Sequence, residues 1–87
     1  MARLNGKIAV ITGGAGDIGE ASGKRFAEEG ADVLLVDLDE QALDSVLQRI
    51  NMPRVSCFAA DVTKACDNDA MIAEATRRFG GVDIFLA

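Results

Sequence analysis

Glycines at short intervals give one stretch of this chain, Val10 to Gly19, the ability to bind phosphate groups. The stretch reads Val-Ile-Thr-Gly-Gly-Ala-Gly-Asp-Ile-Gly, so that an apolar run passes into a glycine-rich turn and a helical pattern follows. Where no Cβ stands in the way, a pyrophosphate reaches the backbone N–H groups at the N-terminus of a helix. This pattern predicts a dinucleotide-binding loop. Its candidate contact residues are Gly13, Gly14, Gly16, Ile18 and Gly19.

Asp37 is a candidate for binding the sugar of such a ligand. It directly follows the apolar run Val33-Leu34-Leu35-Val36 and lies 18 residues beyond Gly19. A carboxylate in this place accepts hydrogen bonds from ribose hydroxyls and repels a 2′-phosphate, which favours NAD over NADP as the cofactor. Leu38 belongs to the same candidate site and is not basic, so it offers no cation for that phosphate. The alternative is that Asp37 only solvates a loop while Asp39 caps the next helix.

Four apolar runs predict the strands that position these residues, and a helical pattern fills each gap between them. Strands that alternate with helices of this length form parallel crossovers, which bury both faces of a sheet. The expected fold is therefore α/β, a Rossmann-type three-layer α/β/α arrangement with a parallel sheet in the strand order 3-2-1-4. The predicted strands span residues 8–11, 33–36, 55–60 and 82–86. The predicted helices span residues 17–29, 40–50 and 64–79.

Small residues and apolar spacing predict how two of the helices end and pack. Gly30 is expected to end the first helix in a left-handed conformation. Gly19 and Gly23 are expected to let this helix lie close on the sheet. Its apolar face is expected to hold Ile18, Ala21, Ser22 and Phe26. In the third helix we expect one face with Ile72, Ala75, Thr76 and Phe79, and a solvated group of Glu74, Arg77 and Arg78.

With these motifs the whole chain resembles the N-terminal part of the short-chain dehydrogenase/reductase family. The loop of that family reads Thr-Gly-x-x-x-Gly-x-Gly, and Thr12, Gly13 and Gly19 match it. The segment Leu4-x-Gly6-Lys7, just before the first predicted strand, fits the family as well. Asp17 stands where the family has its middle glycine.

Asp17 is also a candidate cofactor-binding residue, and its side chain has two possible orientations. At the N-terminus of a helix, an acidic side chain that points outward stabilises the helix by up to about 1 kcal/mol. A carboxylate that faces a bound pyrophosphate would instead repel it. The outward orientation is the favoured prediction, and cofactor affinity is the property that this substitution for glycine can change.

The segment Ala60-Asp61-Val62-Thr63 is similar to the Asp-Val segment that lies against the adenine in this family. The resemblance implies that Asp61 accepts a hydrogen bond from the exocyclic adenine amine. It also implies that Val62 offers backbone and apolar contact. The alternative is a strand-end acid followed by Thr63 as the N-cap of the third helix, and both roles are compatible.

The resemblance covers all 87 residues of the chain but only the first part of the family's length. Residues 82–87 are similar to the fourth strand of the family, with Ala87 at the place of its first asparagine. The family transfers hydride with a serine, a tyrosine and a lysine that lie further along; this chain has no tyrosine, and its three serines have no partner base. We assign no catalytic residue. Residues 1–87 are expected to be the N-terminal part of a single NAD(P)-binding Rossmann domain, truncated before the catalytic residues.

By this resemblance the intact protein is expected to be an NAD-dependent oxidoreductase. It would transfer hydride between nicotinamide and a small-molecule alcohol or ketone, and it would be a homo-oligomer. One alternative is a non-catalytic nucleotide-binding module. Another is a related fold that uses the same loop for epimerisation or dehydration.

Composition narrows the range of partners. The net charge is −5 and the sequence pI is about 4.5, which argues against nucleic acid or an anionic membrane as a partner. There is no histidine, and Cys57 and Cys66 lack a metal-ligand spacing, so no metal site is expected. No apolar run approaches the ~18 residues of a membrane span and no signal peptide fits, so we predict a cytoplasmic protein.

Overall fold

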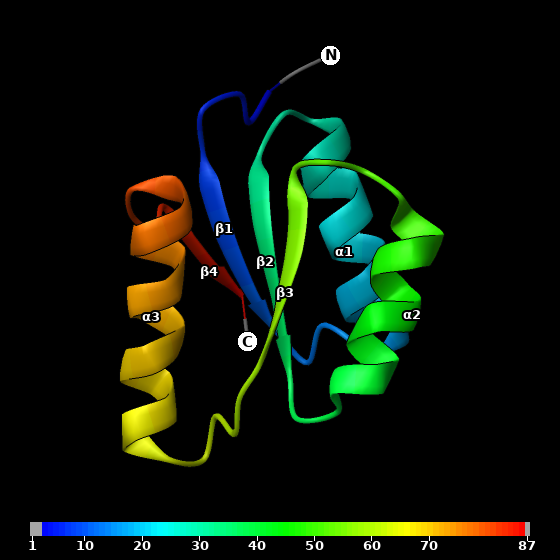
Figure 1. Cartoon of the computed structure of the whole chain (residues 1–87). Coiled ribbons are helices and arrows are strands. Elements are labelled where there is room, and N and C mark those ends of the chain that lie inside the picture. Colours follow the sequence, from blue (N-terminus) through cyan, green and yellow to red (C-terminus); the bar gives the residue numbers. More distant parts are fainter. Residues whose placement is uncertain (1–2, 87) are drawn as a thin grey trace.

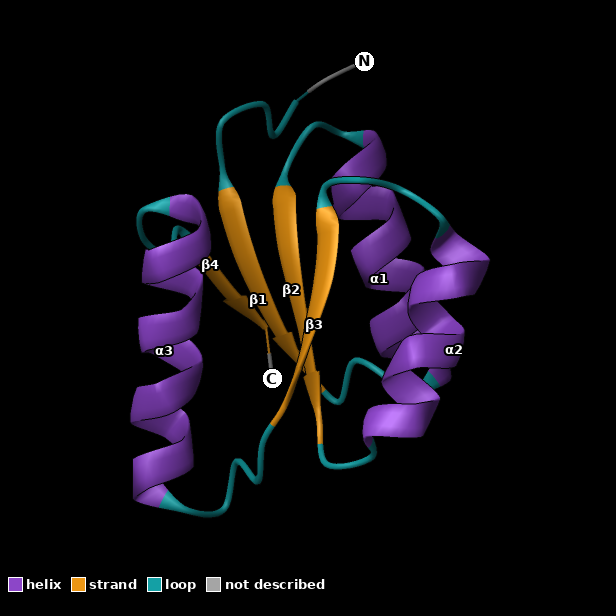
Figure 2. Cartoon of the chain, viewed as in Figure 1, coloured by secondary structure: helices purple, strands orange, loops and turns teal. Residues whose placement is uncertain are grey.

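Four parallel strands form one sheet in the computed structural model of the chain, which describes residues 3–86. Their order is β3-β2-β1-β4, as predicted (Figure 2). Ala87, predicted at the place of the family's asparagine, lies outside the described residues. The strands are β1 (Ile8–Thr12), β2 (Asp32–Asp37), β3 (Val55–Ala59) and β4 (Ile84–Leu86).

Helices cover both faces of this sheet, which confirms the predicted three layers. Helices α1 (Asp17–Glu28) and α2 (Glu40–Ile50) lie side by side on one face, and α3 (Ala65–Phe79) lies on the other (Figure 1). All helix and strand ends lie within two residues of the predicted ones. No helix among residues 3–86 is both long and apolar enough to cross a membrane.

The central strand β2 shows why the sheet needs both layers. Val33 and Leu35 pack in the cluster under α1 and α2, whereas Leu34 and Val36 pack in the cluster under α3. All four side chains are completely buried. A strand that is buried on both faces has a continuous apolar sequence, and this is the run from which the strand was predicted.

The buried face of α1 differs from the prediction. Gly19, Gly23 and Ala27 are its buried residues, spaced four apart along one line of the helix. Ile18 is 83% exposed and Ala21 is also exposed, so both were wrongly placed inside. The helix lies so close to its neighbours that its inner face has room only for residues with little or no side chain.

Helix α3 also turns a different face inward. Met71 and Ala75 are buried and Phe79 is half-buried, while Ile72 is 41% exposed and Thr76 is exposed. The prediction placed Ile72 and Thr76 on the inner face, which is wrong because the buried line passes through Met71, one position earlier.

The predicted solvation of Glu74 on α3 is also wrong. Its side chain is only 14% exposed, because Arg77 and Arg78 both bind it. Arg77 Nη2 donates to one carboxylate oxygen at 2.7 Å, and Arg78 Nε donates to the same oxygen. The two arginines themselves remain exposed, as predicted.

Helix ends follow local chemistry in two cases and not in a third. Gly30 has φ +98°, the left-handed conformation predicted for the end of α1. Asp39 caps α2, since its Oδ1 accepts from the Ala42 N–H at 3.1 Å. Thr63, however, does not cap α3: Lys64 is the N-cap residue, and its side chain makes no capping bond.

Strand β4 forms an edge of the sheet and pairs only with β1 among the described residues. Asp83 joins it to the start of β1 twice: its N–H donates to the Ile8 carbonyl at 2.8 Å, and its Oδ2 accepts from the Ile8 N–H at 2.9 Å. Phe85 and Leu86 are 49% and 37% exposed. Within residues 3–86 the outer edge of β4 thus has no strand partner.

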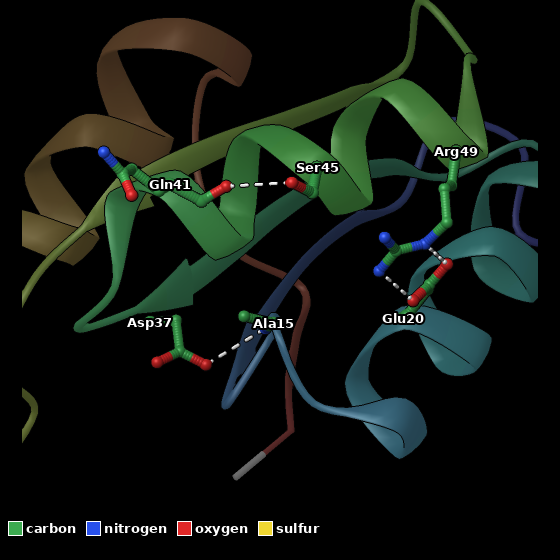
Figure 3. A network of polar contacts seen from close by, with 6 residues as sticks. All are labelled: Ala15, Glu20, Asp37, Gln41, Ser45 and Arg49. Carbon is green, nitrogen blue, oxygen red and sulfur yellow. Dashed lines mark hydrogen bonds and ion pairs between the residues drawn. The ribbon is translucent and has the colours of Figure 1, made fainter.

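Arginines hold two helix carboxylates in ion pairs. Arg49 of α2 donates from Nε and Nη2 to the two oxygens of Glu20 on α1, at 2.9 and 2.8 Å (Figure 3). These bonds lower the pKa of Glu20. The bonds from Arg78, and then those from Arg77, lower the pKa of Glu74.

We predict that the free energy of unfolding falls when the pH drops below the ordinary glutamate pKa of about 4.3. A carboxyl group whose pKa is lowered by folding binds more protons in the unfolded chain, so its contribution is present above the unfolded pKa and is lost as the pH falls through the folded one. The double variant Glu20→Gln, Glu74→Gln should show a shallower loss between about pH 5 and about pH 2 in urea unfolding. Glu28→Gln is the control, since no ion pair holds Glu28 among residues 3–86; an equal flattening in this variant would contradict the prediction.

Candidate functional site

A cavity of about 250 Å³ opens at the carboxyl ends of β1, β2 and β3. In parallel α/β sheets this is the edge at which ligands bind. Five of the residues that line it were candidate site residues in the sequence: Gly13, Asp37, Leu38, Asp61 and Val62. Three further lining residues were not: Val36, Ala60 and Thr63.

The other five candidates, Gly14, Gly16, Asp17, Ile18 and Gly19, lie in the loop after β1 and in the first turn of α1. They do not line the cavity. The loop leaves β1 with Gly13 at φ +68°, a conformation that side chains resist. The predicted site therefore consists of a cavity and a neighbouring loop that share Gly13.

Gly14 brings the loop directly against β2. Its N–H donates to the Val36 carbonyl at 2.9 Å. A Cβ on Gly14 would lie 2.7 Å from the Leu35 Cβ and 3.0 Å from the Leu35 Cα, which is closer than real Cβ atoms come to their neighbours. Only glycine fits here, because the obstacle includes backbone.

Gly19 brings α1 against the loop in the same way. A Cβ on Gly19 would lie 2.3 Å from the Gly13 carbonyl oxygen and 2.8 Å from the Gly14 Cα. The prediction that Gly19 packs on the sheet is wrong: it packs on the loop. Gly23, one turn later, does face the sheet, with the Leu35 Cδ2 at 2.8 Å from the position of its missing Cβ.

The helix start itself is exposed. Gly16 is the N-cap of α1 with φ −81° and ψ 166°, an extended conformation open to any residue. Asp17 is the first helical residue and is exposed. Ile18 is also exposed. The first N–H groups of an α-helix have no acceptor within the helix, so this end offers donors and a positive dipole end to an anion.

Asp37 connects the cavity with the loop. Its Oδ2 accepts from the Ala15 N–H at 3.0 Å (Figure 3), and its Oδ1 accepts from the Leu38 N–H at 2.7 Å. The side chain therefore does more than solvate a loop, although Asp39 does cap α2. The bond to Ala15 could not be found in the sequence, because the two residues are 22 positions apart and share no pattern.

Asp61 is fixed by its neighbours at the other side of the cavity. Its Oδ1 accepts from the Thr63 hydroxyl at 2.6 Å and from the Thr63 N–H at 3.0 Å. The hydroxyl bond first, and then the backbone bond, lower the pKa of Asp61, so this carboxylate is ionised at neutral pH. An Asp-x-Thr sequence after a strand is a recognised turn signal, and this signal would have identified Thr63 as a partner of Asp61.

Two side chains from the first turn of α3 hydrogen-bond to the backbone of the segment that contains Asp61 and Thr63. Asp67 Oδ2 accepts from the Asp61 N–H at 2.9 Å. Asn68 Nδ2 donates to the Val62 carbonyl at 2.7 Å and to the Lys64 carbonyl at 3.1 Å. Sequence reasoning missed both residues, although Asp and Asn in the first turn of a helix commonly bind nearby backbone groups.

The arrangement suits a ligand with both polar and apolar surface. Its two carboxylates, on Asp37 and Asp61, act only as hydrogen-bond acceptors when ionised, so they select hydroxyl or amine donors. The apolar part of the cavity wall is formed by Val36, Ala60 and Val62. The adjoining helix start favours negative charge. A nucleotide meets these requirements. Its base has an apolar face and can carry an amine, its sugar has hydroxyl groups, and its phosphate has negative charge.

Known proteins are similar to this chain in sequence and in fold. The model of the short chain dehydrogenase family matches residues 7–87. The chain is 38% identical over 84 residues to an uncharacterized oxidoreductase of Staphylococcus epidermidis, covering 97% of the chain and 36% of that protein. It is 44% identical over 82 residues to a 2,5-dichloro-2,5-cyclohexadiene-1,4-diol dehydrogenase of Sphingobium indicum, covering 92% of the chain and 33% of that protein.

Among solved structures, a 3-ketoacyl-(acyl-carrier-protein) reductase from Brucella melitensis, complexed with NADH, matches 94% of the chain with a TM-score of 0.87 and 41% identity. The match covers 34% of that protein. The chain thus spans about a third of the length of these relatives.

We predict that Gly19→Ala lowers the free energy of unfolding by about 1–3 kcal/mol, as overpacking does, despite the gain of about 1 kcal/mol in helix propensity. The added Cβ would meet the backbone of Gly13 and Gly14, which cannot move aside without displacing the loop. Gly23→Ala is the matched control on the same helix face: its Cβ meets only the end of the Leu35 side chain, and it should cost less. Urea unfolding of the two variants compares them; equal losses would contradict the prediction.

Proposed function

The chain belongs to the short-chain dehydrogenase family, and from this we propose that it is the cofactor-binding part of an NAD-dependent oxidoreductase. Residues 1–87 would then form the N-terminal part of a single Rossmann domain. The observation that carries the proposal is the cavity between two fixed carboxylates, Asp37 and Asp61, beside a glycine-rich helix start. Two named relatives support it, one a dehydrogenase and the other a reductase complexed with NADH.

We assign each part of the cofactor to residues whose chemistry fits it. The pyrophosphate would lie on the loop and helix start formed by Gly13, Gly14, Gly16, Asp17, Ile18 and Gly19. The adenosine ribose would bind Asp37 next to Leu38. The adenine would lie against Val62, with its amine donating to Asp61, where Thr63 occupies Oδ1 and no bond to Oδ2 is formed within residues 3–86.

The nicotinamide of a bound NAD supplies the chemistry, by accepting or releasing a hydride. The residues of this chain would bind and orient the adenosine and pyrophosphate parts of the cofactor. None of them is assigned a catalytic role. In the longer enzyme the reaction would interconvert a small-molecule alcohol and its ketone. We further propose that this enzyme is a cytoplasmic homo-oligomer.

We expect the chain to bind NAD at least about tenfold more tightly than NADP, because the carboxylate of Asp37 repels the 2′-phosphate. Isothermal titration with the two cofactors measures the ratio, and Asp37→Asn should bring it to within about threefold by removing the charge. Asp39→Asn is the control, since it neutralises a carboxylate two residues away that caps α2. Failure to bind NAD at millimolar concentration would overturn the proposed function; an unchanged ratio in Asp37→Asn would overturn only the role of Asp37.

Substitution of Asp17 tests whether its carboxylate points away from the bound pyrophosphate. Because its side chain is exposed, Asp17→Asn should change the dissociation constant for NAD by less than about threefold at physiological salt. It should lower the free energy of unfolding by up to about 1 kcal/mol, since a favourable interaction with the helix dipole is lost. Titration and urea unfolding of the same sample give both values. A tenfold gain in NAD affinity would instead place the carboxylate facing the pyrophosphate.

A further inference from the structure

We propose that Asp37 is also a positioning residue, whose carboxylate holds the glycine-rich loop in its ligand-binding conformation before any cofactor arrives. The benefit for cofactor binding rests on the proposed function. The contact itself does not, because it joins two parts of this chain. The inference therefore has a test of its own.

The loop needs such support because of its composition. Gly13, Gly14 and Gly16 account for three of its four residues before α1, and glycine loses more conformational freedom on ordering than any other residue. Three backbone bonds constrain it: Gly14 N–H to the Val36 carbonyl at 2.9 Å, Gly16 N–H to the Gly13 carbonyl at 3.0 Å, and Glu20 N–H to the Gly16 carbonyl at 2.9 Å. Only the first of these ties the loop to the sheet.

Asp37 adds the next tie along the loop. Val36 holds the N–H of Gly14, and Asp37, the following residue, holds the N–H of Ala15 through its side chain at 3.0 Å (Figure 3). Two successive loop residues are thus bound by two successive residues at the end of β2. The bond lies in a half-buried place, where water competes less for the N–H group than it does at the surface.

The carboxylate is itself held in a fixed orientation. Its second oxygen accepts from the Leu38 N–H at 2.7 Å, so both oxygens carry a backbone donor. Each oxygen of a carboxylate has a further lone pair, and these remain for the ribose hydroxyls. Asp37 can therefore bind the sugar without releasing Ala15, so that one side chain both selects the cofactor and orders the loop that receives the phosphates.

This arrangement has a consequence for cofactor exchange. A substitution that removes the carboxylate to admit NADP also removes the support of the loop. Asp37→Ala should therefore weaken NAD binding by about tenfold or more, because the loop must then be ordered at the expense of binding and the ribose hydroxyls lose their acceptor. For NADP, relief of the charge repulsion opposes the loss of loop support, so the preference for NAD over NADP should narrow.

Amide hydrogen exchange of the 15N-labelled chain without ligand tests the inference directly. In Asp37→Ala the exchange of the Ala15 amide should accelerate by about tenfold or more, while the amides of the core residues Val33 and Leu35 keep their rates. Asp37→Asn retains one acceptor oxygen and should restore part of the protection at Ala15. The control, Asp39→Ala, removes a similar carboxylate bond at 3.1 Å, and should accelerate Ala42 but not Ala15.

Three results would overturn the inference. The first is an Ala15 exchange rate within about twofold of the original chain in Asp37→Ala. The second is an equal acceleration at Ala15 and in the core, which would make Asp37 a residue of general stability. The third is acceleration of Ala15 in the Asp39→Ala control. Because no cofactor is present, none of these results depends on whether the chain binds NAD.

Discussion

The close packing of the glycine-rich loop between α1 and β2 is the constraint on which the site depends. Positions 14 and 19 have no room for a Cβ, since one would strike β2 and the other would strike the loop backbone. These two contacts fix the start of α1 next to the carboxyl end of the sheet. The polar turns after β2 and β3 then face the same space, and the cavity is what remains between them. The ligand site thus follows from backbone packing before any side chain contributes to it.

Much of the fold could be predicted because its signals are local. The run Val33 to Val36 is apolar throughout since both faces of β2 are buried, and this pattern survives in any single window of sequence. Gly30 ends α1 because a left-handed residue is needed there, a requirement that belongs to one position. The parallel direction of the strands follows from their alternation with helices. Within the site, the same local signals identified Asp37 and Asp61 as strand-end acids that line the cavity.

The errors concern contacts that depend on how side chains and neighbouring segments pack in three dimensions. Ile18 is apolar and begins a helix, but the glycines beside it face inward because the loop leaves no space, and helical spacing alone cannot show that. The burial of Glu74 depends on which of its neighbours fold back over it. The bond between Asp37 and Ala15 joins a strand end to a loop through a side chain, which leaves no periodic trace in the sequence. Which of the candidate residues bind a cofactor stays a prediction.

The pairing of β4 with β1 bears on how the chain folds. Strand β2 pairs with β1 and with β3, its two neighbours along the chain, so these pairings close loops of moderate length. The bonds between Asp83 and Ile8 join residues 75 positions apart, and closing so long a loop costs more conformational entropy. Because β4 has only three residues, its pairing with β1 offsets little of this cost. During synthesis the first three strands and their two connecting helices are made before β4. We therefore expect a nucleus of β1, β2 and β3 to form first, with β4 added last and lost first in partial unfolding.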